Sequence, residues 1–328
     1  MKPLALRRAA LAAVVALALA APYLLPNWRT QMALLFIMIV FALTWDLLGG
    51  QMGYNSFGNV LFFGVGMYVC AIVQRDGHLG YFAGLLLGSG AGALVAVALA
   101  ALLGSGILGL RGHYFAIGTL GLGVAAGELA SGWDFVGAGG GMVPPLYPGA
   151  LGSRETFFYY LCLALPAITL PFLRWLYKGR FGLVLNAIRD DEDKAEAMGL
   201  RTTRYKTSAW CISAFFLGLS GGAVGNLLGF IDPREVAFPV DTFGVWMVLM
   251  AILGGKGTLW GPVIGAVIFH VTKELAWTYL LGWQRVSLGL LIVVIVVFFP
   301  VGILGWARER WPERFGHAVE ASPGEASR

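Results

Sequence analysis

Apolar segments as long as a lipid bilayer is thick follow one another through most of this chain, separated by short polar stretches. Of the 328 residues, 58% are hydrophobic and only 12% are charged, whereas soluble domains carry about 25% charged residues. A water-soluble fold of this size could not bury so much apolar surface. Because lipid offers no partner to a free backbone polar group, the segments must be helical. The sequence therefore predicts an all-α, polytopic membrane helix bundle.

About ten membrane-spanning segments are predicted, some of them short or broken. They are residues 1–26, 32–48, 59–74, 80–104, 114–130, 157–177, 207–231, 243–253, 261–281 and 286–302. A helix needs about 20 residues to cross unaided, so we expect glycine-rich flanks to extend 59–74 and 243–253, or these two to be re-entrant. The first segment also has the pattern of a cleavable signal peptide; since further hydrophobic segments follow it, we favour an uncleaved span.

Basic residues are distributed unevenly between the two sides of this bundle. An even number of spans places both basic chain ends on the same side as a charged loop at 178–206. The basic residues of the ends are Lys2, Arg7, Arg8, Arg308, Arg310 and Arg314. The loops of the other side keep one arginine each: Arg29, Arg75, Arg154, Arg234 and Arg285. Since basic loops stay inside the cell, we predict that both termini are cytoplasmic. The net charge of +5 is attributed to these basic residues that set the membrane orientation. It is not taken as a sign of nucleic-acid binding, and no nucleic-acid partner is expected.

The loop at 178–206 holds most of the clustered charge and has a helical pattern. Acidic residues at 190–193 suit a helix N-terminus, and Gly199 suits a helix end. At helical spacing, Ile188, Ala195 and Met198 fall on one face. Two interpretations stay open: a solvated helical connector, or a docking helix that presents Met198 and Leu200 to a cytosolic partner.

Two glycine-rich stretches, 49–58 and 253–266, and a further stretch at 110–120 lie at the ends of predicted spans. Glycines permit both close helix packing and breaks in helices that line a polar cavity. The Gly-Gly-Lys-Gly-Thr run at 254–258 is not a phosphate-binding loop, because a glycine separates its lysine from its threonine. Two acidic residues within or beside spans, Glu128 and Asp46, are candidates for function, although an interfacial position suits Glu128 equally well.

Together with the loop, these stretches resemble the branched-chain amino acid ABC importer permease family over about residues 45–305. Family-like runs are GQMGYNSFG with FFGVGMY, RGHYFAIGTL, the loop sequence GLVLNAIRDDEDKAEAMGL, and GGKGTLWGPVIG. The Glu-Ala-Met-Gly run at 196–199 is also similar to the loop of ABC permeases in general, with a more compact spacing. In this family the loop forms a cytosolic coupling helix that inserts into an ATPase subunit.

The resemblance implies specific roles. The coupling residues would be Arg189, Asp190, Asp191, Glu192, Glu196, Ala197, Met198, Gly199 and Leu200. Candidates for the translocation path are Asn55, Ser56, Tyr114, Thr119 and Gly255. Residues 1–306 would form the transmembrane permease domain, with the coupling loop 178–206 inside it, and 307–328 a short cytosolic tail.

The resemblance also implies an assembly in the bacterial inner membrane that imports branched-chain or other hydrophobic amino acids. Its other parts would be a second homologous permease, two ATPase subunits that bind ATP and magnesium, and an extracytoplasmic solute-binding protein. This chain itself would touch lipid, bind no cofactor or metal, and be non-catalytic.

Other classes of function remain as alternatives. A related ABC importer would carry urea, short amides or other amino acids through a similar permease. A self-contained secondary transporter would need buried charge pairs in mid-membrane, and the predicted spans hold very few charges. A membrane enzyme is the weakest alternative, because the sequence shows no carboxylate pair, nucleophile constellation or metal-ligand cluster.

Overall fold

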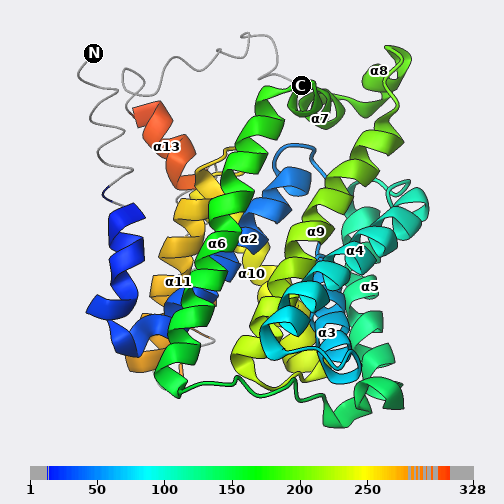
Figure 1. The fold of residues 1–328 in the computed structure, drawn as a ribbon. Helices are drawn as coiled ribbons and strands as arrows, with labels where there is room; N and C mark the ends of the chain where they lie inside the picture. Colours follow the sequence, from blue (N-terminus) through cyan, green and yellow to red (C-terminus); the bar gives the residue numbers. More distant parts are fainter. Residues whose placement is uncertain are drawn as a thin grey trace.

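The computed structural model describes residue 13 and residues 15–279, 282–283, 286, 289–290, 293, 297 and 302–310. The described residues form helices and turns without a strand, so the all-α prediction is confirmed (Figure 1). The helices are Val15–Leu24, α2 (Arg29–Gly49), α3 (Val60–Asp76), α4 (Tyr81–Ile107), α5 (Gly112–Gly132), α6 (Leu151–Lys178), α7 (Arg180–Asp190), α8 (Glu192–Ala197), α9 (Thr202–Leu228), α10 (Val245–Gly254), α11 (Gly261–Tyr279) and α13 (Gly302–Arg310). Two π-helical turns, η4 (Pro233–Ala237) and η5 (Val240–Gly244), precede α10.

Six of the described helical segments are long and apolar enough to cross a membrane. They are Pro26–Gly49, Tyr81–Ile107, Gly112–Gly132, Leu151–Lys178, Thr202–Leu228 and Pro233–Gly254. The predicted spans 59–74 and 261–281 correspond to the shorter helices α3 and α11. The predicted span 243–253 is extended on its N-terminal side: α10 has only 10 residues, but with η4 and η5 it forms the spanning candidate Pro233–Gly254. Most of the predicted span 286–302 lies outside the described residues, as do residues 1–12 and the tail beyond 310.

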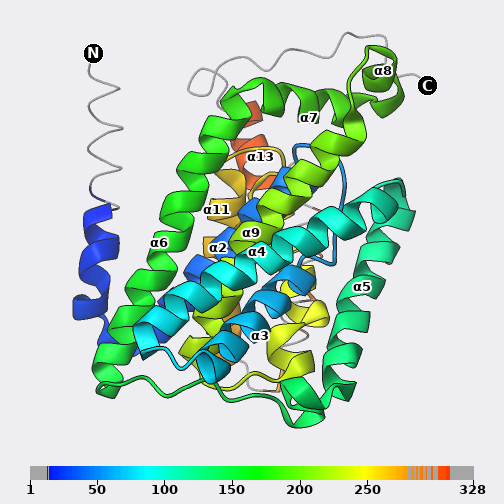
Figure 2. The same cartoon turned by 45° about the vertical axis from the view of Figure 1, so that its right-hand side comes forward.

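Helices α2 and α9 form the centre of the bundle. Helix α9 packs against α3 and α4, while α2 packs against α6, α10 and α11 (Figures 1 and 2). Glycines bring the first group into backbone contact: a Cβ added at Gly66 of α3 would lie 2.1 Å from the carbonyl oxygen of Gly218 in α9. A Cβ at Gly218 would lie 2.7 Å from Ala93 Cα in α4. The abundance of glycine therefore serves close helix packing, as it does in many membrane proteins.

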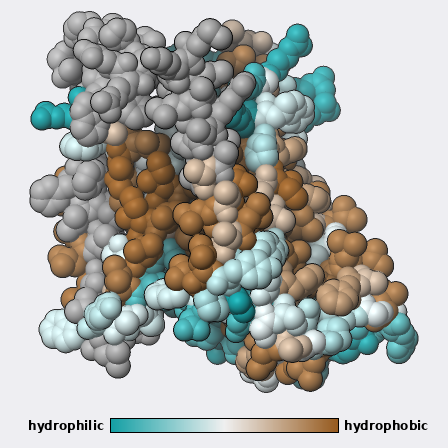
Figure 3. All heavy atoms as spheres, turned by 60° about the vertical axis from the view of Figure 1, so that its left-hand side comes forward, coloured by the Kyte–Doolittle hydropathy of each residue, from teal (hydrophilic) through white to brown (hydrophobic). Residues whose placement is uncertain are grey.

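The outside of the bundle is apolar between two polar ends. Figure 3 shows a brown band of hydrophobic side chains with teal, hydrophilic residues above and below it. On α4, Leu86, Leu94 and Leu102 are 66–75% exposed. Helices that present leucine outward in this way face lipid or a partner chain rather than water.

The two ends of the bundle differ in structure. One end, called here the α7–α8 end, carries α7, α8, the start of α9 and α13 (top of Figure 1). The opposite end carries the connection at 133–150 and the first turns of α2 and α6. Five arginines were predicted to share one side of the bundle. Four of them lie at the end opposite to α7 and α8, and the fifth, Arg285, lies outside the described residues. The four are Arg29, Arg75, Arg154 and Arg234, which contact Gly152, Phe135, Asn226 and Glu128 respectively.

Candidate functional site

The predicted coupling segment consists of two helices rather than one. Asp191 has an extended backbone (φ −165°, ψ 104°), which ends α7 and begins α8. Its carboxylate accepts a hydrogen bond of 3.0 Å from the backbone N–H of Lys194. An aspartate in this position satisfies a free N–H of the first helical turn. The acidic residues at 190–193 therefore do lie at a helix N-terminus, whereas Ile188 belongs to the preceding helix α7. Gly199 has φ +86° and ends α8 as expected.

Helix α7 lies across the end of the bundle (Figure 2). Its side chains Leu185 and Ile188 are buried, at 0% and 3% exposure. Gly182 permits the close approach, since a Cβ there would lie 2.4 Å from the carbonyl oxygen of Tyr177 in α6. Helix α7 is therefore packed onto the bundle rather than free in solvent.

Helix α8 is anchored to the bundle by its first residue, Glu192. One carboxylate oxygen pairs with Lys206 Nζ at 2.6 Å, and the other accepts a hydrogen bond from the Tyr54 hydroxyl. Lys206 also donates to the carbonyl oxygen of Leu108 at 2.7 Å and to the Tyr54 oxygen at 3.0 Å. Arg111 adds contacts of 3.6 Å to Glu192 and 2.9 Å to Asp193. We call Tyr54, Arg111, Glu192 and Lys206 the anchor cluster; it joins α8 to α9, to the start of α5 and to the α2–α3 loop.

Three members of the anchor cluster, Tyr54, Glu192 and Lys206, are buried, while the side chain of Arg111 is 54% exposed. The side chains of Lys206 and Glu192 are only 4% and 10% exposed. Burial raises the pKa of Glu192, but the hydrogen bonds from Lys206 and Tyr54 and the charge of Arg111 outweigh it, so the net pKa is lowered. The same burial, together with the neighbouring carboxylate, raises the pKa of Tyr54. Glu192 is therefore held ionised at neutral pH, and its charge is compensated by hydrogen-bonded partners, as a buried ion requires.

The rest of α8 is presented to solvent. Met198 is 83% exposed, while Ile188 and Ala195 are each 3% exposed. The prediction that these three share one face was therefore wrong, because the break at Asp191 and the end of the helix at Gly199 turn Met198 outward. Of the other predicted coupling residues, Glu196 accepts a hydrogen bond from Thr202, Ala197 is exposed and Leu200 is half-buried.

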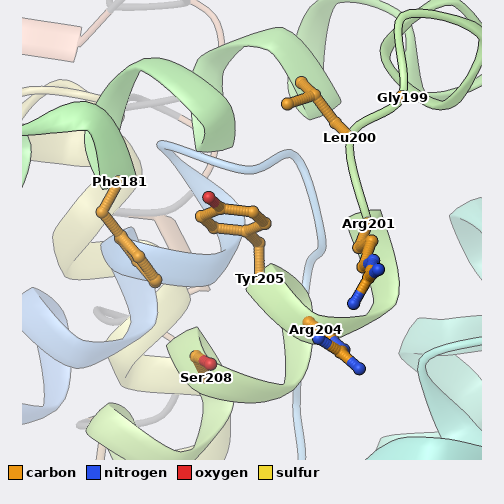
Figure 4. A pocket seen from close by; sticks show the side chains of 7 residues that line it. All are labelled: Phe181, Gly199, Leu200, Arg201, Arg204, Tyr205 and Ser208. Atoms are coloured by element: carbon orange, nitrogen blue, oxygen red, sulfur yellow. The ribbon is translucent and has the colours of Figure 1, made fainter.

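A groove separates α7 from the start of α9 and is shown in Figure 4. Its volume is about 430 Å³. The lining residues are Phe181, Gly199, Leu200, Arg201, Arg204, Tyr205 and Ser208. The rings of Phe181 and Tyr205 lie 5.5 Å apart and form an apolar wall beside two arginines. Such a groove suits a partner segment that carries apolar and acidic side chains.

The two glycine-rich stretches meet beneath α7. The carboxylate of Asp46, at the end of α2, accepts a hydrogen bond of 2.6 Å from the backbone N–H of Gly257. A Cβ at Gly50 would lie 2.4 Å from that same nitrogen. Arg189 and Asp190, two predicted coupling residues, pair with each other at 3.0 Å, and Arg189 also lies against Gly53. The buried acid Asp46 thus connects the 49–58 and 253–266 stretches directly under the coupling segment.

The predicted translocation-path residues do not form one cluster. Ser56 and Thr119 are fully buried where the α2–α3 loop meets α5; Ser56 bonds to Asn59, and Thr119 accepts a hydrogen bond from the backbone N–H of Phe57. Asn55 and Tyr114 are exposed, and Gly255 packs against Gly261 and Gly302 near α13. Their role in the path stays a prediction.

Sequence reasoning missed the anchor cluster itself. Lys206 stands near the beginning of an apolar span, and a charged side chain in such a position needs a partner. The position of Lys206 could therefore have indicated an acidic partner in the preceding loop. Nothing in the sequence pointed to Tyr54, which lies 138 residues from Glu192 along the chain.

Comparison with known proteins now adds to this geometry. The family described as "Branched-chain amino acid transport system / permease component" matches residues 27–299. The chain belongs to this family. It is therefore a membrane permease component of the branched-chain amino acid transport class, with α7, α8 and the glycine stretches inside the matched region.

Curated relatives agree with the family. The chain is 27% identical to the high-affinity branched-chain amino acid transport system permease protein LivM of Salmonella typhimurium, over 94% of this chain and 77% of that protein. It is 31% identical to the corresponding LivH protein of the same organism, over 50% of this chain and 55% of that protein. The fructose import permease protein FrcC of Rhizobium meliloti is 28% identical over 39% of this chain and 38% of that protein. No solved structure matches the chain.

Proposed function

We propose that this chain is one of two related permease subunits in an ATP-driven importer of branched-chain or other hydrophobic amino acids. The α7–α8 end faces the cytoplasm, where two ATPase subunits dock on it. An extracytoplasmic binding protein delivers the solute to the opposite end. Similarity to both LivM and LivH supports a pair of permeases, and the clustering of basic residues at the α7–α8 end supports the orientation.

The anchor cluster is the observation that carries this proposal. Helix α8 exposes Met198 and Glu196 to a partner, yet Glu192 fixes it to the bundle through contacts of 2.6 Å and 3.6 Å to Lys206 and Arg111. A displacement of α8 by a partner would therefore move the start of α9, the start of α5 and the α2–α3 loop together. A helix with a free outer face and a fixed inner face is suited to transmit such a displacement.

The mechanism follows from that connection. ATP binding brings the two ATPases together and displaces α8. The ion pairs of the anchor cluster pass this movement to α9, which packs along α3 and α4 by glycine contacts. The bundle then exchanges between outward-open and inward-open states, with the ATPase interaction shifting the populations. Hydrolysis of ATP takes place on the partner subunits.

Purification from host membranes tests the assembly. We expect the tagged chain to bring with it a second permease and an ATPase, and the complex in liposomes to accumulate leucine only with ATP and the binding protein. Leucine transport by this chain alone, without an ATPase, would support the secondary-transporter alternative instead.

A matched pair of variants tests the docking face. Met198 on α8 and Leu146 at the opposite end are similarly exposed, at 83% and 86%. Met198→Asp should reduce ATPase co-purification and leucine uptake, while Leu146→Asp should leave the ATPase bound. Equal ATPase recovery with both variants would contradict docking on α8.

A further inference from the structure

A second groove lies at the opposite end of the molecule, between α5 and the π-helical segment η4–η5. Its volume is about 440 Å³. It is lined by Leu120, Val124, Gly127, Glu128, Arg234, Glu235, Phe238, Val240, Asp241 and Val245. In Figure 2 the yellow segment before α10 lies beside the lower half of α5. The groove lies where the π-helical turns η4 and η5 interrupt the segment before α10, opposite the continuous helix α5.

The groove carries an ion pair at its mouth, and further in its wall is apolar except for Asp241. Glu128 lies four residues before the end of α5 at Gly132, which is about 6 Å along a helix. Leu120 lies twelve residues before Gly132, which is about 18 Å along the helix at about 1.5 Å per residue. At the mouth, Arg234 Nη2 pairs with Glu128 Oε2 at 2.7 Å, and both side chains remain more than half exposed.

Four ionisable side chains line this one groove, so lipid hydrocarbon is an unfavourable neighbour for it. They are Glu128, Arg234, Glu235 and Asp241. Charged groups that face hydrocarbon are costly, and in membrane proteins they face water-filled cavities or other protein. The helix that carries Glu128 is itself a membrane-spanning candidate. The charged lining of this groove therefore suits contact with water or with other protein.

The chemistry of the lining matches an amino acid with an apolar side chain. Arg234 pairs with Glu128 through Nη2 and has further N–H groups that suit a second carboxylate. The carboxylates of Glu235 and Asp241 suit an ammonium group, and Val124, Val240, Val245 and Leu120 offer a branched aliphatic surface beside Asp241. Pockets of roughly 300–1,000 Å³ that combine an apolar wall with a few polar groups are typical of small-molecule sites.

We propose that this groove is a solute site on the way into the translocation path, and that it takes a zwitterionic amino acid with an aliphatic side chain. Arg234 holds the carboxylate, Asp241 holds the ammonium group, and the valines contact the side chain. The inference rests on the proposed import function and adds to it the place and the groups of recognition.

The test compares two exposed arginines of the same end in the reconstituted complex. Arg234 lines the groove, whereas Arg75 pairs with Asp76 at 2.7 Å away from it. Arg234→Gln should raise the KM for leucine uptake at least about tenfold, the effect of losing one hydrogen bond to a charged group. Arg75→Gln should transport as the unaltered complex does. Equal KM values for the two variants overturn the proposal.

A protection experiment covers the case in which Arg234→Gln fails to assemble. Val124→Cys is reacted with a small water-soluble thiol reagent in the full complex, with and without leucine. The proposal predicts labelling that leucine slows several-fold, and that 3-methylbutylamine, which lacks the carboxylate, slows much less. Labelling that leucine does not affect, or a groove closed by contact with the second permease, overturns the proposal. Leucine uptake by the unaltered complex tests the import function separately.

Discussion

Removal of the Lys206 charge should release α8 from the bundle. In Lys206→Met the Glu192 carboxylate, only 10% exposed, loses its 2.6 Å partner. Breaking a buried ion pair from one side costs about 3–5 kcal/mol. Glu192 keeps Tyr54 and Arg111, so we take the lower value of about 3 kcal/mol, which corresponds to a shift of roughly a hundredfold between anchored and released α8.

Thiol labelling at a buried position of α8 measures that shift. Ala195 is 3% exposed, so a cysteine there reacts only when α8 is released, at a rate set by the opening equilibrium. We expect Lys206→Met to accelerate labelling of Ala195→Cys by one to two orders of magnitude. In the double variant Lys206→Met with Glu192→Gln, labelling should be slower again, because the carboxylate that had lost its Lys206 partner is no longer charged.

Lys194→Met is the matched control for this experiment. Lys194 forms an ion pair of 2.9 Å with Asp191, but its side chain is 83% exposed. Exposed pairs contribute little, so labelling should change little. Equal labelling rates for Lys206→Met and Lys194→Met would refute the claim that the anchor cluster holds α8.

Three further perturbations probe other parts of the structure. Because the pKa of Glu192 is lowered in the folded protein, its ionised carboxylate stabilises the fold above the unfolded pKa of about 4.3. This stabilisation is lost as the pH falls through the lower folded pKa. Hydrogen exchange of α8 should therefore become faster below about pH 4, but not in Glu192→Gln. Gly66→Ala should lower the melting temperature of the purified protein, since its Cβ would meet backbone at 2.1 Å, whereas Gly90→Ala, with nothing within 4 Å, should not. Asp46→Ala should cost about 1–3 kcal/mol by leaving the Gly257 N–H unpaired, and Asp46→Asn, which keeps an acceptor oxygen, should cost less in the same melting assay.

The sequence was sufficient for the class of fold. Continuous apolar segments can satisfy their backbone in lipid only as helices, so the helix bundle was predictable from the length of these segments. That Arg29, Arg75, Arg154 and Arg234 lie at one end of the bundle was also predictable, because each loop charge must stay at a membrane surface.

The details of the coupling segment were not predictable from periodicity. A helical pattern that includes Ile188 and Ala195 cannot show that one helix ends and another begins at Asp191, because an aspartate suits either an exposed helix position or a cap. Lys206, 14 residues from Glu192, could have pointed to an acidic partner in the loop. Tyr54 lies 138 residues away, so its contact with Glu192 appears only when tertiary contacts are known. The same holds for the groove at Arg234, whose walls come from α5 and from turns more than a hundred residues later.

A photo-crosslinking amino acid at position 198 tests the central claim most directly. Met198 is 83% exposed on α8, so the substituted side chain reaches whatever docks there in membranes of the native host. We predict a covalent product with an ATPase subunit, formed on the cytoplasmic side and changed in yield by ATP. A product with lipid alone, or crosslinking only to reagents and proteins outside the cell, would contradict the account.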